Sequence, residues 1–345
     1  MFTPAGKIAL RTHISMNVGL GHYSRLVNLR SNLKNEMIWF ISGDRKIIKK
    51  IYKKKFFYVD EKNDGEEKVL NYLLKNNINK IIMDLGFEKN ISSKKIYTIQ
   101  EIYLKSKIKL ISFDDARQKI MSDISIIPTV SSSKLVLKRA KKTKIFCGHE
   151  YNFFSNLRNK NNYTNNLKKK IRNILISISG TDTNNTGLKI LKLLANEDYK
   201  FTIVSGKKID FNSKKNIILK RNINKISSLN FISKKDMFNQ IRKADLGICG
   251  PGVVKFDFSI FQKPFVLILS KKDLKNIQIQ EFLKFNNCKT IITEKKSFKS
   301  YQIEEILKYI DNFKKQRINI KNSKKFFNRK KLFKKQKTLL KAISN

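Results

Sequence analysis

A glycine-rich turn that carries a histidine is the segment of this sequence best suited to chemistry. Gly19, Gly21 and His22 follow an apolar run and open a helical pattern, as expected at the mouth of a βα unit. Glycine lets a ligand approach the main chain closely, and free amides at a helix start favour an anion. An imidazole with a reference pKa of about 6.5 can accept a proton at neutral pH. His22 is therefore the candidate general base, and a structural turn with a surface histidine is the alternative.

Two turns in the second half of the chain have the composition of phosphate-binding loops. Gly180, Thr181 and Asp182 separate an apolar run from a helical pattern, and residues 250–253 do the same further on. Backbone amides at such positions can hold a diphosphate without a cationic side chain. Asp257 follows about one turn later and could accept hydrogen bonds from ribose hydroxyls. Ordinary loop geometry is the alternative for each turn taken alone.

Short β-branched runs alternate with longer amphipathic stretches over roughly the first 150 residues. This alternation predicts parallel strands with crossover helices. Ligands gather at the carboxyl ends of such strands, where Asp84, Asp114 and Asp115 stand. The predicted strands are 7–10, 37–41, 80–84, 109–113 and 124–127.

A second series of the same kind follows a stretch rich in Asn and Lys. It predicts strands at 173–179, 201–204, 217–219, 245–249 and 265–269, and a helix at 186–194. We therefore expect an α/β protein with two doubly wound, Rossmann-like domains. The expected parts are an N-terminal sugar and catalytic domain (1–154), a linker (155–172), a C-terminal nucleotide-binding domain (173–311) and a basic helix or tail (312–345).

The chain is strongly basic, with 74 Lys and Arg against 27 Asp and Glu and a formal net charge of +47 over 345 residues. The excess is mostly lysine, scattered along the whole length together with Asn and Ile. Evenly spread lysine forms solvated faces, whereas nucleic-acid recognition concentrates Arg and aromatic side chains on one surface. We therefore expect no specific nucleic-acid partner.

The lysine-dense C-terminal tract predicts an amphipathic basic helix. Its apolar positions include Phe326, Phe327, Leu332 and Phe333. We expect these side chains to pack across the domains, and a peripheral contact with anionic membrane lipid is the alternative.

The three cysteines, Cys147, Cys249 and Cys288, are far apart and lack metal-ligand spacing. The N-terminus has no cleavable apolar segment. These features favour a reducing, cytoplasmic location, and we expect neither a metal nor a cofactor.

In order and spacing, the motifs resemble those of the UDP-sugar hydrolase family of pseudaminic acid biosynthesis. Members remove UDP from UDP-2,4-diacetamido-2,4,6-trideoxy-β-L-altropyranose, and the spore coat polysaccharide biosynthesis family is related. The matching segments cover about residues 7–290 and are 19–22 with Arg25, 112–115, 147–148 with Tyr151, 180–182, 231–232, 250–257 and 263–264.

The resemblance implies the glycosyltransferase B fold, with nucleotide in the C-terminal half and sugar facing an interdomain cleft. It implies that His22 acts on a water that attacks the anomeric carbon, releasing UDP and a free amino sugar. The implied substrate-binding residues are Gly19, Gly21, Arg25, Asp114, Asp115 and Tyr151, although the two aspartates could equally cap a helix. The implied nucleotide-binding residues are Gly180, Thr181, Asp182, Phe231, Ile232, Gly250, Gly252, Val253 and Asp257.

Several positions depart from the family pattern. His13 stands where relatives carry aspartate, and Leu85-Gly86-Phe87 lacks a phenolic oxygen. Asp257 replaces a glutamate, and Gln262 replaces a glycine. These departures leave open a different amino sugar or a UDP-sugar-dependent glycosyltransferase. A noncatalytic basic protein that binds RNA or a membrane surface is the alternative from another class.

Overall fold

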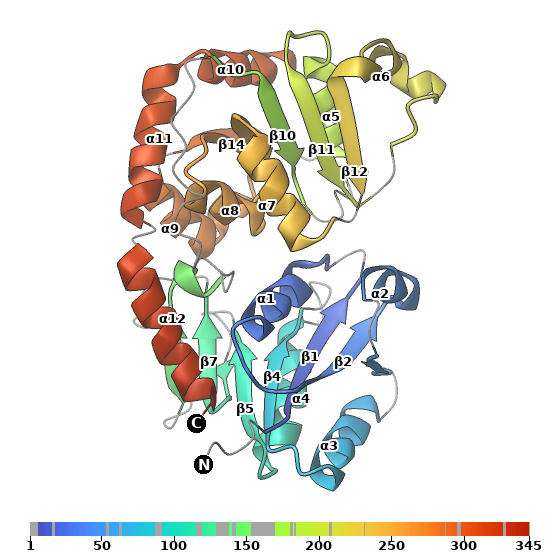
Figure 1. Cartoon of the computed structure of the whole chain (residues 1–345), viewed down its shortest axis with the longest axis vertical. Coiled ribbons are helices and arrows are strands. Elements are labelled where there is room, and N and C mark those ends of the chain that lie inside the picture. Colours follow the sequence, from blue (N-terminus) through green and yellow to red (C-terminus); the bar gives the residue numbers. More distant parts are fainter. Residues whose placement is uncertain are drawn as a thin grey trace. The chain divides into compact units, whose positions relative to one another are not determined.

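The chain divides into two compact units (Figure 1). Unit 1 comprises Met1–Arg158 and Arg329–Asn345, and unit 2 comprises Asn159–Asn328. The computed structural model describes residues 6–344 except 16–17, 53–54, 62–63, 87–91, 115–118, 129–137, 140–142, 153–169, 180–181, 183, 207–208, 231, 287, 295–297 and 327–328. Most of the expected linker, 155–172, lies outside the described residues.

Unit 1 is built on a parallel sheet with the strand order β3-β2-β1-β4-β5-β7-β9. Its strands are β1 (Ile8–Ile14), β2 (Met37–Gly43), β3 (Phe57–Tyr58), β4 (Lys80–Asp84), β5 (Lys109–Phe113), β7 (Ile124–Ile127) and β9 (Lys144–Cys147), and β6 (Lys119–Ile120) pairs separately with β8 (Lys138–Arg139). Its helices are α1 (Gly21–Arg30), α2 (Arg45–Ile51), α3 (Gly65–Lys75), α4 (Ser92–Leu104), the short 3₁₀ helix η2 (His149–Asn152) and α12 (Arg329–Ser344).

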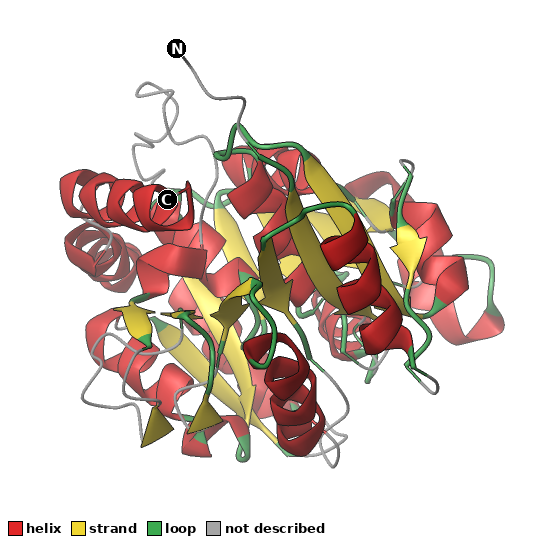
Figure 2. Ribbon diagram, turned by 90° about the horizontal axis from the view of Figure 1, so that it is seen from below, coloured by secondary structure: helices red, strands yellow, loops and turns green. Residues whose placement is uncertain are grey.

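Both faces of the central strands of the unit 1 sheet are buried, and most residues of these strands are apolar, apart from a polar segment at the end of β1. Alternate residues of β1 point to opposite faces: Leu10 packs with Leu26 of α1, whereas Ala9 packs with Val69 of α3. Helices flank the strands on both sides (Figure 2). This arrangement directs the polar carboxyl ends of the strands to one edge of the sheet.

Unit 2 repeats the design with the parallel strand order β12-β11-β10-β13-β14-β15. Its strands are β10 (Asn173–Ser177), β11 (Lys200–Ser205), β12 (Ile226–Asn230), β13 (Leu246–Cys249), β14 (Phe265–Ser270) and β15 (Lys289–Thr293). Its α-helices are α5 (Thr186–Leu194), α6 (Ile217–Arg221), α7 (Lys234–Lys243), α8 (Val254–Ile260), α9 (Ile277–Asn286), α10 (Ser300–Ile310) and α11 (Phe313–Phe326). The predicted class, two doubly wound α/β domains, is confirmed.

The strand predicted at 217–219 is wrong, because these residues form helix α6. Leu219 is buried while Ile217 is 54% exposed, as on two sides of a helix. The true neighbour of β11 is β12, an edge strand of only partly buried residues. Its sequence, ISSLN, carries a weaker apolar signal than the Ile-Ile-Leu run before it.

The C-terminal tract forms two described helices, and they belong to different units. Helix α11 belongs to unit 2, whereas α12 packs on unit 1. Leu332, Leu339 and Ile343 of α12 are buried, but Phe333 is 39% exposed. Phe327 lies outside the described residues. Among the described helices, none is long and apolar enough to cross a membrane.

Candidate functional site

The predicted histidine lies at the topological switch point of unit 1. In a doubly wound sheet this point falls between the two central strands from which the chain winds in opposite directions, here β1 and β4. His22 lies in the first turn of α1, directly after β1, and Asp84 is the last residue of β4. Two side chains separated by 62 residues therefore meet at one edge of the sheet.

His22, Asp84 and Arg25 form a compact hydrogen-bonded group. His22 Nδ1 lies 2.6 Å from Asp84 Oδ1. Arg25 donates to both carboxylate oxygens, from Nε to Oδ2 at 2.7 Å and from Nη2 to Oδ1 at 2.8 Å. The Asp84 side chain is fully buried, whereas 25% of the His22 side chain is exposed. The imidazole is therefore the most accessible member of the group, since 15% of the Arg25 side chain is exposed.

The charge state of Asp84 decides which nitrogen of His22 carries the proton. Burial alone would raise the pKa of Asp84, but the charges of Arg25 and His22 and their hydrogen bonds outweigh it and lower this pKa. An ionised carboxylate only accepts hydrogen bonds, so Nδ1 must be the donor. Arg25 Nη2 also lies 3.0 Å from Nδ1, a longer contact between two donors. Nε2 then keeps its lone pair and can accept a proton.

Gly86 lies directly against the reactive edge of this imidazole. A Cβ atom added at Gly86 would lie 2.2 Å from His22 Nε2 and 2.8 Å from Cδ2. Only glycine therefore leaves room for the ring in this position. This contact gives a steric reason for a glycine at position 86, in the segment Leu85-Gly86-Phe87 that departs from the family pattern. Phe87 lies outside the described residues.

We expect Gly86→Ala to lower turnover by ~10²-fold, because the new methyl group must displace the imidazole and small misplacements of a catalytic group are costly. Binding of UDP, the nucleotide that the sequence resemblance implies, should change little. Steady-state kinetics and calorimetry with UDP measure both effects. Gly6→Ala is the matched control, since a Cβ there meets nothing within 4 Å. Normal turnover in the Gly86 variant would contradict this prediction, because it would show that the position of the His22 imidazole beside Gly86 is not required for activity.

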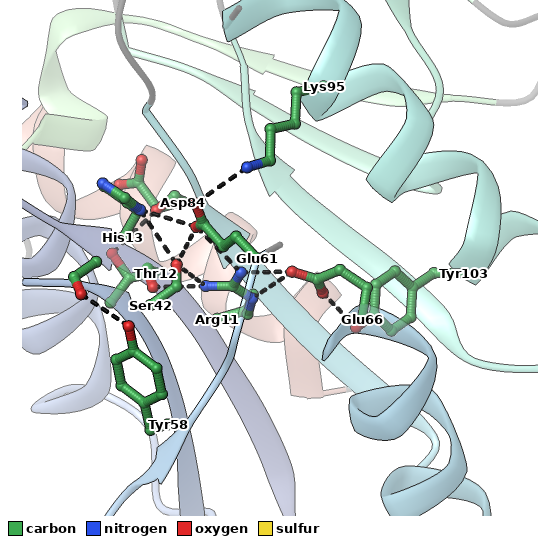
Figure 3. Close-up of polar contacts among 11 residues, drawn as sticks. Arg11, Thr12, His13, Ser42, Tyr58, Glu61, Glu66, Asp84, Lys95 and Tyr103 are labelled. Atoms are coloured by element: carbon green, nitrogen blue, oxygen red, sulfur yellow. Dashed lines mark hydrogen bonds and ion pairs between the residues drawn. The ribbon is translucent and has the colours of Figure 1, made fainter. Parts of the chain in front are cut away.

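A second polar cluster occupies the same edge of the sheet, around the fully buried side chain of Arg11 (Figure 3). Arg11 is paired with Glu66 and donates to Ser42 Oγ at 2.8 Å. His13 Nδ1 lies 2.8 Å from Glu61 Oε1, and Lys95 lies 3.1 Å from Glu61 Oε2. These contacts join β1 to β2, α3 and α4.

The cluster is linked to the His22–Asp84–Arg25 group through Thr12. Thr12, between Arg11 and His13 on β1, donates its hydroxyl to the backbone oxygen of Asp84 at 3.0 Å. His13, the departure noted in the sequence, is buried in these contacts with only 10% of its side chain exposed. We therefore assign the cluster to holding the sheet edge in place.

Glu61→Gln should destabilise the protein at neutral pH by about 1–3 kcal/mol. Burial alone would raise the pKa of Glu61, but hydrogen bonds from His13 and Ser42 and nearby charges lower it to about 2. A carboxyl with a lowered folded-state pKa stabilises the fold above its unfolded value and loses that contribution as pH falls, here from about 4.5 towards 2. Urea unfolding at pH 7, 4 and 3 should show the gap between wild type and variant closing. A gap that is constant with pH would refute the assignment.

The other predicted site residues of unit 1 differ in their surroundings. Gly19 has φ +81°, a conformation that favours glycine, and Gly21 is the first residue of α1. Asp114 is buried and accepts hydrogen bonds from Gln100 at 2.9 Å and Ser125 at 2.6 Å, so its carboxylate is held by the protein itself. Tyr151 is also buried. Asp115 lies outside the described residues.

The two predicted phosphate turns follow the central strands of unit 2, which are the adjacent strands β10 and β13. Gly180 and Thr181 lie outside the described residues. Asp182 accepts hydrogen bonds from the amides of Thr186 and Gly187, both at 2.9 Å, so its carboxylate caps the start of α5. The topology thus places the carboxyl ends of β10 and β13 at the switch point of the sheet, where ligands bind in such folds.

The turn after β13 combines a tight and an open glycine. A Cβ at Gly250 would lie 2.2 Å from the backbone oxygen of Ile178, whereas a Cβ at Gly252 would meet nothing within 4 Å. Val253 precedes α8. Gly250 therefore packs against the segment after β10, and Gly252 borders open space.

Asp257, the predicted ribose contact, is fully buried and paired with Lys234. Its Oδ1 atom has no hydrogen-bond partner in the described part of the chain. Burial raises the pKa of Asp257, and the charges of Lys234 and Lys255 offset part of that rise. Because the Asp257 side chain is 0% exposed and Oδ2 is paired with Lys234, a ribose could reach this carboxylate only after a local rearrangement. Ile232 is half-buried, two residues before Lys234, and Phe231 lies outside the described residues.

Comparison with known proteins agrees with this architecture. Residues 177–337 match the glycosyltransferase family 28 C-terminal domain. The structure resembles UDP-GlcNAc 2-epimerase of Neisseria meningitidis bound to UDP-GlcNAc, with a TM-score of 0.56 at 13% identity over 97% of this chain and 100% of the other. It also resembles MurG of Acinetobacter baumannii, with a TM-score of 0.56 at 10% identity over 92% and 95%.

A further similar structure is a UDP-glucosyltransferase of Polygonum tinctorium, with a TM-score of 0.62 at 8% identity over 100% of both chains. The chain has the glycosyltransferase B fold. An uncharacterized protein of Methanocaldococcus jannaschii is 29% identical over 296 residues, which are 81% of this chain. The matched region spans 58% of the length of that relative.

Asp84, Gly86 and Lys234 were not among the predicted site residues. Asp84 was recognised as a strand-ending aspartate, which is the signal that could have assigned it. Gly86 and Lys234 carry no comparable signal, because their importance depends on contacts with residues distant in the sequence.

Proposed function

We propose that this chain is a UDP-sugar hydrolase in which unit 1 supplies the general base and unit 2 holds the nucleotide. The observation that carries the proposal is the His22–Asp84 contact at 2.6 Å, which leaves Nε2 as the acceptor on a partly exposed imidazole. The glycosyltransferase B fold supports a nucleotide-sugar substrate. The family 28 match over the C-terminal half supports nucleotide binding by unit 2.

In this mechanism His22 Nε2 removes a proton from water as its oxygen attacks the anomeric carbon. The bond from that carbon to the diphosphate breaks, and UDP leaves with the bonding electrons. Asp84 stabilises the imidazolium that forms, and Arg25 keeps Asp84 ionised and fixed. UDP is a good leaving group, so no strong acid is needed on the opposite side.

The nucleotide would contact the turns that follow β10 and β13. Backbone amides of Gly180, Thr181, Gly252 and Val253 would hold the diphosphate. Asp257 would contact the ribose after a local rearrangement, and residues 231–232 would contact the uracil. The substrate we expect is a UDP-linked amino sugar of pseudaminic acid or related surface-glycan synthesis.

A glycosyltransferase is the second candidate, favoured by the family 28 match itself. The same base would then deprotonate an acceptor hydroxyl instead of water. The two reactions differ in their requirement for an acceptor, which makes them easy to separate.

The deciding experiment incubates the full chain with a panel of UDP-amino sugars in water enriched in the heavy oxygen isotope. Hydrolysis predicts sustained UDP release without acceptor, with the label in the anomeric hydroxyl of the sugar and none in UDP. Release that requires an added glycan supports transfer, and a new UDP-sugar isomer supports epimerisation. If UDP neither is released nor raises the melting temperature at moderate salt, a noncatalytic basic protein is the better description.

A further inference from the structure

A buried lysine at the start of α8 contacts the turn that follows β13. Lys255 is 2% exposed, and its Nζ donates to the backbone oxygens of Pro251 and, at 3.0 Å, Gly252. The ammonium group also lies 4.1 Å from the ring centroid of Phe256 and 5.5 Å from that of Phe282. Burying a charge costs free energy unless the charge is well paired, so the burial of the Lys255 ammonium group requires an explanation.

The two carbonyl contacts determine where the neighbouring amides point. In a trans peptide the C=O and N–H bonds of one unit point in opposite directions, and the described chain has no cis peptide bond. Because the oxygens of Pro251 and Gly252 turn towards Nζ, the N–H groups of Gly252 and Val253 turn away from it. Neither amide has a hydrogen-bond partner among the described residues.

Two observations show that a ligand can approach this turn and that a polar group beside it lacks a partner. Open space borders Gly252, where an added Cβ would meet nothing within 4 Å. In the same segment, Asp257 Oδ1 is buried without a hydrogen-bond partner in the described residues. A buried side-chain oxygen without a partner is rare unless a ligand or ion completes it, whereas the amide of the exposed Gly252 is open to a ligand.

We propose that Lys255 is a positioning residue that orients the amides of Gly252 and Val253 towards the diphosphate of the nucleotide. It acts from the buried side of the turn and does not touch the ligand. This inference rests on the proposed function and adds to it a residue that fixes selectivity for the diphosphate over the nucleoside. Burial lowers the pKa of Lys255 to about 8, so its charge can be titrated under mild conditions.

The test compares UDP with uridine by calorimetry on the full chain. Lys255→Met should weaken UDP binding by about tenfold or more, because the amides of Gly252 and Val253 lose their alignment with the charged diphosphate. Uridine affinity should remain within about twofold, since uridine lacks the diphosphate. Equal loss of both affinities, or no loss of either, would overturn the inference.

Lys263→Met is the matched control. Lys263 is also a buried lysine of unit 2, and its Nζ donates to the backbone oxygens of Arg242 at 2.9 Å and Ala244 at 2.5 Å. This variant should lose stability but keep the ratio of UDP to uridine affinity. A change in that ratio equal to that of the Lys255 variant would contradict a specific role.

A titration of the unaltered chain tests the inference even if Lys255→Met does not fold. The ratio of UDP to uridine affinity should fall several-fold between pH 7 and pH 9, as Lys255 loses its proton. Titration of the uracil itself cancels in this ratio. A ratio that does not change over this range would overturn the inference while leaving the proposed function intact, whereas no UDP binding by the unaltered chain would overturn both.

Discussion

Replacing His22 by asparagine should lower kcat for UDP-sugar hydrolysis by ~10²–10⁴-fold, the range typical of losing a general base. Asparagine can still donate a hydrogen bond to Asp84 Oδ1, which His22 Nδ1 contacts at 2.6 Å, but it has no group that accepts a proton near neutral pH. UDP affinity should change little, because the proposed nucleotide contacts lie in unit 2. Steady-state kinetics and UDP calorimetry on the same preparation measure both quantities.

His149→Asn is the control for this substitution. His149 is a buried histidine of unit 1 whose Nδ1 lies 3.1 Å from the backbone oxygen of Pro128. This variant should lose stability while its folded fraction keeps normal turnover. Wild-type kcat in the His22 variant would exclude the imidazole as the base, and a parallel loss of UDP affinity would indicate a structural role instead.

Asp84→Asn should have the second largest effect, with kcat reduced by ~10²–10³-fold. The amide cannot stabilise an imidazolium, and its NH₂ group would face the donors of Arg25, which now contact both carboxylate oxygens. Arg25, only 15% of whose side chain is exposed, would also lose its partner, which we expect to destabilise the fold by about 3 kcal/mol, the lower end of the range for a broken buried ion pair. Kinetics should therefore be measured at low temperature, with the folded fraction determined by urea unfolding.

Glu66→Gln separates the catalytic effect of Asp84→Asn from its effect on stability. Glu66 is the ion-pair partner of the buried Arg11, in the same unit, and does not contact His22. This variant should be destabilised to a similar degree, yet its folded molecules should keep near-normal kcat. If both variants lose turnover equally, Asp84 acts only by supporting the fold.

Local sequence patterns were sufficient to predict most of the fold. Runs of buried β-branched residues alternate with amphipathic stretches, and each pattern depends on neighbours within one element. The sequence does not predict the edge strand β12, because its residues are only partly buried and its apolar periodicity is weak. In the preceding Ile-Ile-Leu run, Leu219 is buried and Ile217 is exposed, as on two sides of a helix.

The sequence by itself determined the order of elements, the glycine turns and the position of His22 at a strand–helix junction. Tertiary structure alone decided which side chains meet: Asp84 approaches His22 across 62 residues, and Gly86 clears the space for its ring. Burial of Asp257 against Lys234 was likewise decided by packing. The physical reason is that periodicity reports local conformation and burial, whereas contacts at a sheet edge depend on strand order and register, which no single segment encodes.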